Sequence, residues 1–72
     1  MKNYGEELKF QREANNLTQL ELARKTGIKQ CNISRWESGK VVPSIEYCEK
    51  LADFYGISID ELIGRDGFVT RK

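Results

Sequence analysis

The chain has 72 residues, which limits it to a single small domain. Hydrophobic residues make up 39% and charged residues 32%, a balance typical of a globular domain rather than of a disordered or membrane-spanning chain. The net charge of +1 hides an uneven distribution, because residues 9–41 carry an excess of four positive charges and residues 42–66 an excess of four negative charges. This asymmetry fits either a surface that binds a polyanion or solvated charge without a partner, and charge alone favours neither.

Several classes of function are disfavoured by the residues that the sequence lacks. Histidine, the commonest metal ligand and the usual general base near neutral pH, is absent. Cys31 and Cys48 form no CxxC pair of the kind that binds zinc or carries out redox chemistry. A single disulfide could join them, but no segment resembles an export signal or a transmembrane helix, so we expect free thiols in the cytoplasm. We therefore expect a protein that is not an enzyme and that needs no metal, no cofactor and no membrane.

Turn and cap signals divide the chain into short helical segments. Three of these segments open on a polar cap followed three residues later by Glu, the spacing of a capping box: Asn3 and Glu6, Thr18 and Glu21, Ser58 and Glu61. A glycine that can adopt a left-handed conformation follows each of the last four: Gly27, Gly39, Gly56 and Gly64. The expected helices cover approximately residues 4–15, 18–26, 29–38, 44–55 and 58–63. The sequence thus predicts an all-α domain over residues 1–64, followed by a tail over 65–72 that has no helical period.

The second and third segments are joined by about three residues, so the two helices must cross steeply, as in a helix-turn-helix. Apolar residues near this join can form a small core: Leu22, Ala23, Ile28, Ile33 and Trp36. Each of these residues alone fits ordinary packing. Their joint spacing with Gln19 and Gly27 is what indicates a helix-turn-helix. In the fourth segment, residues three and four apart build one apolar stripe: Ile45, Cys48, Leu51, Ala52 and Tyr55.

Several runs stand in register across residues 5–63: Leu17-Thr18-Gln19, Glu21-Leu22-Ala23, Gly27-Ile28, Ile33-Ser34-Arg35, Pro43-Ser44-Ile45 and Gly56-Ile57-Ser58. Together they resemble the lambda-repressor-like helix-turn-helix family, also described as the Cro/repressor or XRE type. The resemblance implies a compact five-helix bundle that binds DNA and regulates transcription. The chain departs from the family at Lys29, where a Ser or Thr cap is common, and at Trp36, where a smaller Ile or Leu is usual.

The third segment would be the recognition helix, which lies in the major groove. If Ile33 and Trp36 face the core, helical geometry turns Cys31, Ser34 and Arg35 outward. The amide of Gln30 suits adenine and the guanidinium of Arg35 suits guanine. The resemblance assigns base reading to Gln30, Cys31 and Arg35, and adds Asn32. The alternative is a solvated helix face that touches no DNA.

Gln19 lies in the first turn of the second helix, where backbone N–H groups and the helix dipole favour a phosphate. The resemblance also assigns this glutamine to the DNA backbone, often braced against the residue that matches Gln30. Further phosphate contacts are expected from residues at the ends of the second and third helices: Thr18, Lys29, Ser38 and Lys40. The resemblance gives Arg12 and Glu37 a structural role, as an ion pair between the first helix and the end of the third.

These expectations combine in a prokaryotic or phage-encoded transcriptional regulator, a repressor that binds a palindromic operator in double-stranded DNA as a homodimer. The dimer contact is expected on the fifth helix and the tail, through Ile63, Phe68 and Val69, with Phe54 nearby. Those residues could instead cap the core. The alternative function is that of an antitoxin, or another interaction module of the same fold, whose main target is a partner protein.

Overall fold

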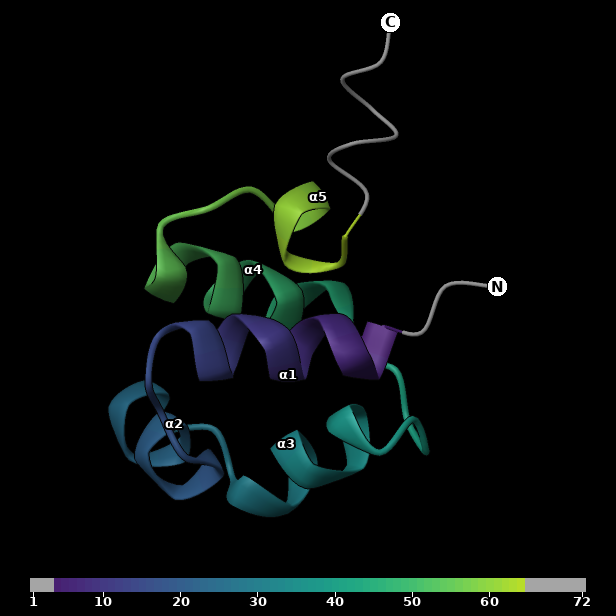
Figure 1. Ribbon diagram of the computed structural model, residues 1–72. Helices are drawn as coiled ribbons and strands as arrows, with labels where there is room; N and C mark the ends of the chain where they lie inside the picture. Colours follow the sequence, from purple (N-terminus) through teal and green to yellow (C-terminus); the bar gives the residue numbers. More distant parts are fainter. Residues whose placement is uncertain (1–3, 65–72) are drawn as a thin grey trace, which may run out of the picture.

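The computed structural model describes residues 4–64, and within that range it contains five α-helices and no strand (Figure 1). They are listed here in chain order: α1 (Tyr4–Ala14), α2 (Gln19–Thr26), α3 (Gln30–Glu37), α4 (Ile45–Tyr55) and α5 (Ile59–Leu62). The predicted all-α fold of five helices is confirmed, with helix ends within one or two residues of the expected ones. The expected cap at Asn3 and the tail over 65–72 lie outside the described residues.

Helix α1 lies between two helix pairs, with α2 and α3 on one side and α4 and α5 on the other (Figure 1). It packs against both α3 and α5, while α2 packs against α3 and α4. The side chains that fill the interior come from all five helices and from the turn between α2 and α3: Leu8, Leu22, Ala23, Ile28, Ile33, Trp36, Cys48, Leu51, Ala52 and Leu62. The small core predicted around the helix-turn-helix is therefore confirmed residue by residue.

Local side-chain chemistry fixes where α2 and α5 begin. At the start of α2, the Thr18 hydroxyl accepts from the Glu21 amide at 3.0 Å, and the Glu21 carboxylate accepts from the Thr18 amide at 2.9 Å. Ser58 and Glu61 repeat this reciprocal pattern at α5. Each arrangement satisfies two N–H groups that a bare helix end leaves without partners. Both capping boxes were predicted by the spacing of the residues and are confirmed.

The first turn of α4 differs from the sequence prediction. Ile45 was expected on the buried stripe of this helix, but 67% of its surface is exposed, so that part of the prediction is wrong. The physical reason lies just before the helix, where Pro43 is buried and its carbonyl oxygen lies 3.9 Å from the Cys48 sulfur. Pro43 thus takes the buried position next to Cys48, and the buried stripe of α4 begins at Cys48.

Helix α1 approaches the end of α3 very closely at Gly5. A Cβ atom placed on Gly5 would lie 2.5 Å from the carbonyl oxygen of Trp36 and 2.7 Å from that of Glu37. Backbone atoms cannot move away as a flexible side chain can, so this crossing requires a residue without a side chain. Nothing in the sequence pattern predicted that role for Gly5.

Candidate nucleic-acid interface

Helix α3 presents one face to the core and another to solvent. Ile33 and Trp36 are 2% and 5% exposed, which fixes the rotation of the helix about its axis. Cys31, Ser34 and Arg35 are consequently exposed, as helical geometry predicts. The outer face thus offers a thiol, a hydroxyl and a guanidinium along one side of a short helix. Guanidinium groups bind guanine edges, and small side chains can approach thymine methyl groups.

The N-terminal end of α3 adds further polar groups. Gln30 is exposed and Asn32 is half-buried on the flank of the helix. Lys29 occupies the cap position in an extended conformation and makes no side-chain cap hydrogen bond. The first N–H groups of α3 therefore lack a side-chain acceptor, and a cation stands beside them. Such an end is electrostatically suited to an anion.

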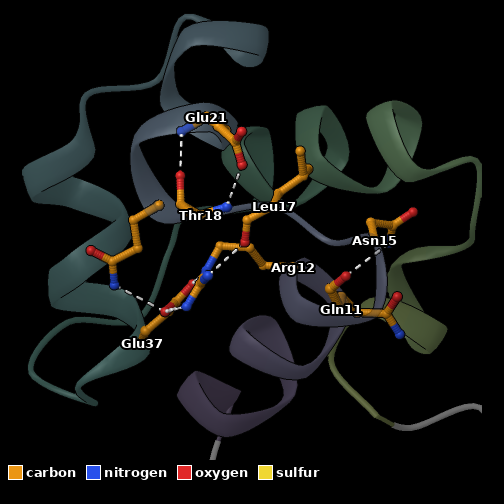
Figure 2. Close-up of polar contacts among 8 residues, drawn as sticks. Gln11, Arg12, Asn15, Leu17, Thr18, Glu21 and Glu37 are labelled. Carbon is orange, nitrogen blue, oxygen red and sulfur yellow. Dashed lines mark hydrogen bonds and ion pairs between the residues drawn. The ribbon is translucent and has the colours of Figure 1, made fainter.

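Arg12 and Glu37 form an ion pair that joins α1 to the last residue of α3 (Figure 2). The Arg12 Nε donates to Glu37 Oε2 at 2.7 Å, and Nη2 donates to Oε1 at 2.9 Å. The third guanidinium nitrogen, Nη1, donates to the Leu17 carbonyl at 2.7 Å, which ties the α1–α2 turn to the same side chain. The side chains are only 10% and 6% exposed. Their hydrogen bonds raise the pKa of Arg12 above its ordinary value, so the guanidinium remains charged.

Gln19 joins this pair rather than the start of α3. Its amide nitrogen donates to Glu37 Oε1 at 3.0 Å. The brace against Gln30 stays a prediction, and the observed bond joins Gln19 to Glu37 at the opposite end of α3. A bond to a charged carboxylate is stronger than one between neutral groups.

A pocket of about 250 Å³ lies where α1, α2 and α3 meet. It is lined by polar and charged side chains from all three helices: Lys9, Arg12, Gln19, Ser34, Glu37 and Ser38. Lys9 and Ser34 were not among the predicted phosphate-binding or base-reading residues. Lys9 precedes Arg12 by three residues and Ser34 precedes Glu37 by three, so each shares a helix face with a member of the ion pair. That spacing was a usable signal in the sequence.

Of the other predicted phosphate contacts, Ser38 lines the pocket, whereas Thr18, Lys29 and Lys40 do not. The Thr18 hydroxyl is occupied as an acceptor in the capping box, and its own hydrogen remains available to a phosphate. The Ser38 hydroxyl donates to the Arg35 carbonyl at 3.0 Å, so it must exchange that bond before it can donate elsewhere. Lys40 is exposed just after α3.

Exposed charges are distributed unequally between the two sides of α1. The exposed cations of the described residues up to position 41 lie on α1 and around the helix-turn-helix: Lys9, Arg24, Lys25, Lys29, Arg35 and Lys40. Exposed carboxylates dominate α4 and α5: Glu46, Glu49, Asp53 and Glu61. The side of the molecule that carries α3 is therefore the side suited to a polyanion.

Three further features bear on the kind of site. In the described part of the chain, no cluster of acidic or sulfur side chains is arranged to hold a metal ion. Among the same residues, no helix has the length and apolar character that crossing a membrane requires. The two thiols are free, with Cys31 exposed and Cys48 buried.

A five-helix fold of this kind, in which α2 and α3 cross after a short turn and α3 keeps one face exposed, is that of a helix-turn-helix protein. A family model described as Helix-turn-helix (HTH_3) matches residues 8–62. The chain therefore belongs to this helix-turn-helix family, the XRE type that the sequence motifs resembled. Relatives of this family include HTH-type transcriptional regulators, a DNA-binding class of proteins that are not enzymes.

The chain is similar to several bacterial regulators. It is 36% identical over 67 residues to the HTH-type transcriptional activator BcrR of Enterococcus faecalis, covering 93% of this chain and 33% of that protein. It is 45% identical over 60 residues to the cryptic phage CTXphi transcriptional repressor RstR of Vibrio cholerae, covering 83% and 54%. It is also 34% identical over 62 residues to the antitoxin PezA of Streptococcus pneumoniae, covering 86% and 39%. The chain thus spans between a third and about half of the length of these relatives.

Solved structures share the fold. An HTH_3 family transcriptional regulator from Vibrio cholerae superposes with a TM-score of 0.81 at 22% sequence identity, covering 94% of this chain and 38% of that chain. At that level of identity the likeness concerns the fold, and it agrees with the five-helix arrangement described above.

Proposed function

We propose that this protein represses transcription by binding a palindromic operator as a homodimer, with α3 in the major groove. The observation that carries the proposal is the outer face of α3, where Gln30, Cys31 and Arg35 are exposed. On the opposite face of the helix, Ile33 and Trp36 pack in the core. This is the geometry in which a recognition helix presents side chains to base edges. The similarity to the repressor RstR supports repression. The similarity to the activator BcrR supports activation, which is the alternative that a test of repression must distinguish.

In this proposal the residues divide by what they contact. Gln30, Cys31, Asn32 and Arg35 read bases, because they lie on the exposed face or flank of α3. Backbone phosphates are bound by residues at the helix ends around it: Thr18, Gln19, Lys29, Ser38 and Lys40. The phosphate contacts position the protein, and the base contacts supply the sequence preference.

The experiment that tests this division starts with selection of bound sequences from a random DNA pool. Lys40→Ala should weaken binding to all sequences alike and reduce the salt dependence of the affinity. Arg35→Ala should relax the preference at one base pair per half-site, a loss of about 1–3 kcal/mol in discrimination. Binding that is insensitive to salt, or no enrichment from the pool, would contradict the proposal.

Homodimerisation is proposed because one recognition helix reads too few base pairs for useful specificity. Phe54 is 39% exposed on α4, while Ile63 is half-buried against the core. Phe68 and Val69 lie outside the described residues. Deleting residues 65–72 should lower the cooperativity of operator binding without changing the melting temperature by more than a few degrees. Unchanged cooperativity would place the contact elsewhere.

A second candidate function is that of an antitoxin, which the similarity to PezA favours. In that case a partner protein, and not an operator, is the main target. A protein of the native host that co-purifies with the chain in a fixed ratio, and that remains bound in high salt, would support this function.

A further inference from the structure

The carboxylate of Glu37 makes more contacts than an ion pair with Arg12 requires. Its Oε1 accepts both from Arg12 Nη2 at 2.9 Å and from the Gln19 amide at 3.0 Å. Glu37 is also the last residue of α3, where the helix dipole disfavours a negative charge. The donors from α1 and α2 compensate for that position, and the 6% exposure of the side chain shields the group from water.

This contact fixes which way the Gln19 amide faces. A carboxylate can only accept hydrogen bonds, so the amide nitrogen must face it, and a flipped amide would place oxygen against oxygen. The nitrogen carries two hydrogens, of which Glu37 takes one. The second stays available at the wall of the pocket, which Gln19 shares with Lys9, Ser34 and Ser38.

We propose that Glu37 is a positioning residue for DNA binding: it orients the amide of Gln19 so that the free N–H donates to a backbone phosphate, while Arg12 neutralises the carboxylate that would otherwise repel that phosphate. The inference rests on the proposed function and deepens it. It gives the ion pair a role in affinity in addition to its role in linking α1 to α3.

The test compares the loss of DNA affinity caused by Gln19→Ala in two backgrounds. In the wild-type background the loss should be ~10-fold, the value of one hydrogen bond to a charged group. The second background is Arg12→Met with Glu37→Met, which removes the carboxylate without leaving Arg12 as an unpaired buried charge. Replacement of a buried ion pair by apolar residues often preserves stability. There Gln19→Ala should cost less than ~2-fold in affinity, because the amide is no longer oriented.

Glu49→Gln supplies the matched control, since Glu49 is an exposed carboxylate on α4 that does not line the pocket shared by Gln19 and Glu37. In that background the Gln19→Ala loss should remain ~10-fold. Equal losses in the wild-type and double-methionine backgrounds, with all variants folded by circular dichroism, would overturn the inference and leave DNA binding intact. No DNA binding by the wild-type protein would overturn the proposed function and this inference with it.

A second measurement needs no DNA. In ¹H–¹⁵N spectra of the free protein, the side-chain amide of Gln19 should be rigid in the wild type and mobile in the Arg12→Met, Glu37→Met variant. The same amide should stay rigid in Glu49→Gln. A mobile Gln19 amide in the wild-type protein would overturn the inference whatever the DNA measurements give.

Discussion

Tyr55 places its hydroxyl in the interior without a hydrogen-bond partner among the described residues. Burial raises its pKa to about 12, and the nearby Glu37 carboxylate adds to the effect. The ring lies in an edge-to-face contact with Phe54, with centroids 5.2 Å apart, so its aromatic part packs well while its polar end does not. A buried hydroxyl without a partner lowers stability relative to hydrogen at the same position.

Tyr55→Phe should therefore leave stability at neutral pH unchanged or raise it by up to about 1 kcal/mol. Because the folded-state pKa lies above the unfolded value of 10, the folded protein holds this proton more tightly. The contribution of this tighter proton binding to the free energy of unfolding is fully present below pH 10. It is lost as pH rises from 10 to 12, by at most about 2–3 kcal/mol. Urea unfolding across this range should show a steeper loss for wild type than for Tyr55→Phe. Tyr47→Phe, which leaves Tyr55 in place, should lose stability with pH as steeply as the wild type. Identical pH dependence of stability in all three proteins would contradict the attribution of this loss to Tyr55.

The two cysteines should differ in reactivity because they differ in exposure. Cys31 is exposed in the first turn of α3, whereas Cys48 is buried and its burial raises the pKa of the thiol. Iodoacetamide should modify Cys31 at least ~10-fold faster than Cys48 in the native protein. Saturating operator DNA should protect Cys31, and Cys31→Ser should remove the fast phase. Equal labelling of Cys31 with and without operator would mean that α3 does not enter the groove.

Helix α1 meets α3 backbone to backbone, and this crossing sets the position of the recognition helix. Gly5→Ala inserts a methyl group 2.5 Å from a carbonyl oxygen of α3, which forces the helices apart. We expect a loss of about 1–3 kcal/mol in the free energy of unfolding. At a helix position with open space around it, the same change would stabilise the protein by about 0.5–1 kcal/mol. The sign of the change in stability therefore shows whether α1 contacts α3 at Gly5. Chemical denaturation measures it, and Phe10→Ala, at a side chain on α1 that is 62% exposed, should stay within about 0.5 kcal/mol of wild type.

At the start of α3, the cap position holds a cation in place of a side chain that would stabilise the helix end. Lys29 caps the helix without a side-chain hydrogen bond, while Thr18, Ser44 and Ser58 all cap theirs. Lys29→Ser should raise stability by about 0.5–1 kcal/mol and should also weaken DNA binding, reducing the salt slope by about 1. Thermal unfolding and salt titrations measure the two effects separately. Lys25→Ser, at an exposed position in the last turn of α2, should give no gain in stability. A rise in affinity for Lys29→Ser would contradict a phosphate contact at this residue.

Features that depend on neighbours along the chain were predictable, and features that depend on tertiary contact were not. The capping boxes at Thr18 and Ser58 need only residues three apart, and the core face of α3 needs only Ile33 and Trp36 in register. The exposure of Ile45 depends on where Pro43 settles, and no spacing encodes that. The resemblance pointed to the pairing of Arg12 with Glu37. The third member, Gln19, was assigned to a different neighbour because the resemblance carries positions and not distances.

Across the whole molecule, the interior is continuous from α2 and α3 through α1 to α4 and α5. Leu8 of α1 and Leu62 of α5 belong to the same core as Ile33 of α3. Helix α3 therefore packs on the same core as the rest of the bundle. A substitution that loosens α1 against α3 should lower affinity for all DNA sequences together with stability, whereas a change on the outer face of α3 should alter sequence preference alone.

The division of exposed charge across α1 also has a kinetic consequence. Among the described residues, cations around α3 and carboxylates on α4 and α5 separate the two signs of charge, which the net charge of +1 does not show. In the field of a DNA duplex, such a separation of charge turns the incoming molecule so that α3 leads before any contact is made. The association rate constant should therefore fall steeply between about 50 and 300 mM salt while the dissociation rate constant changes less. Stopped-flow fluorescence of a dye-labelled operator duplex measures both rate constants, and an association rate independent of salt would mean that encounters occur in random orientation.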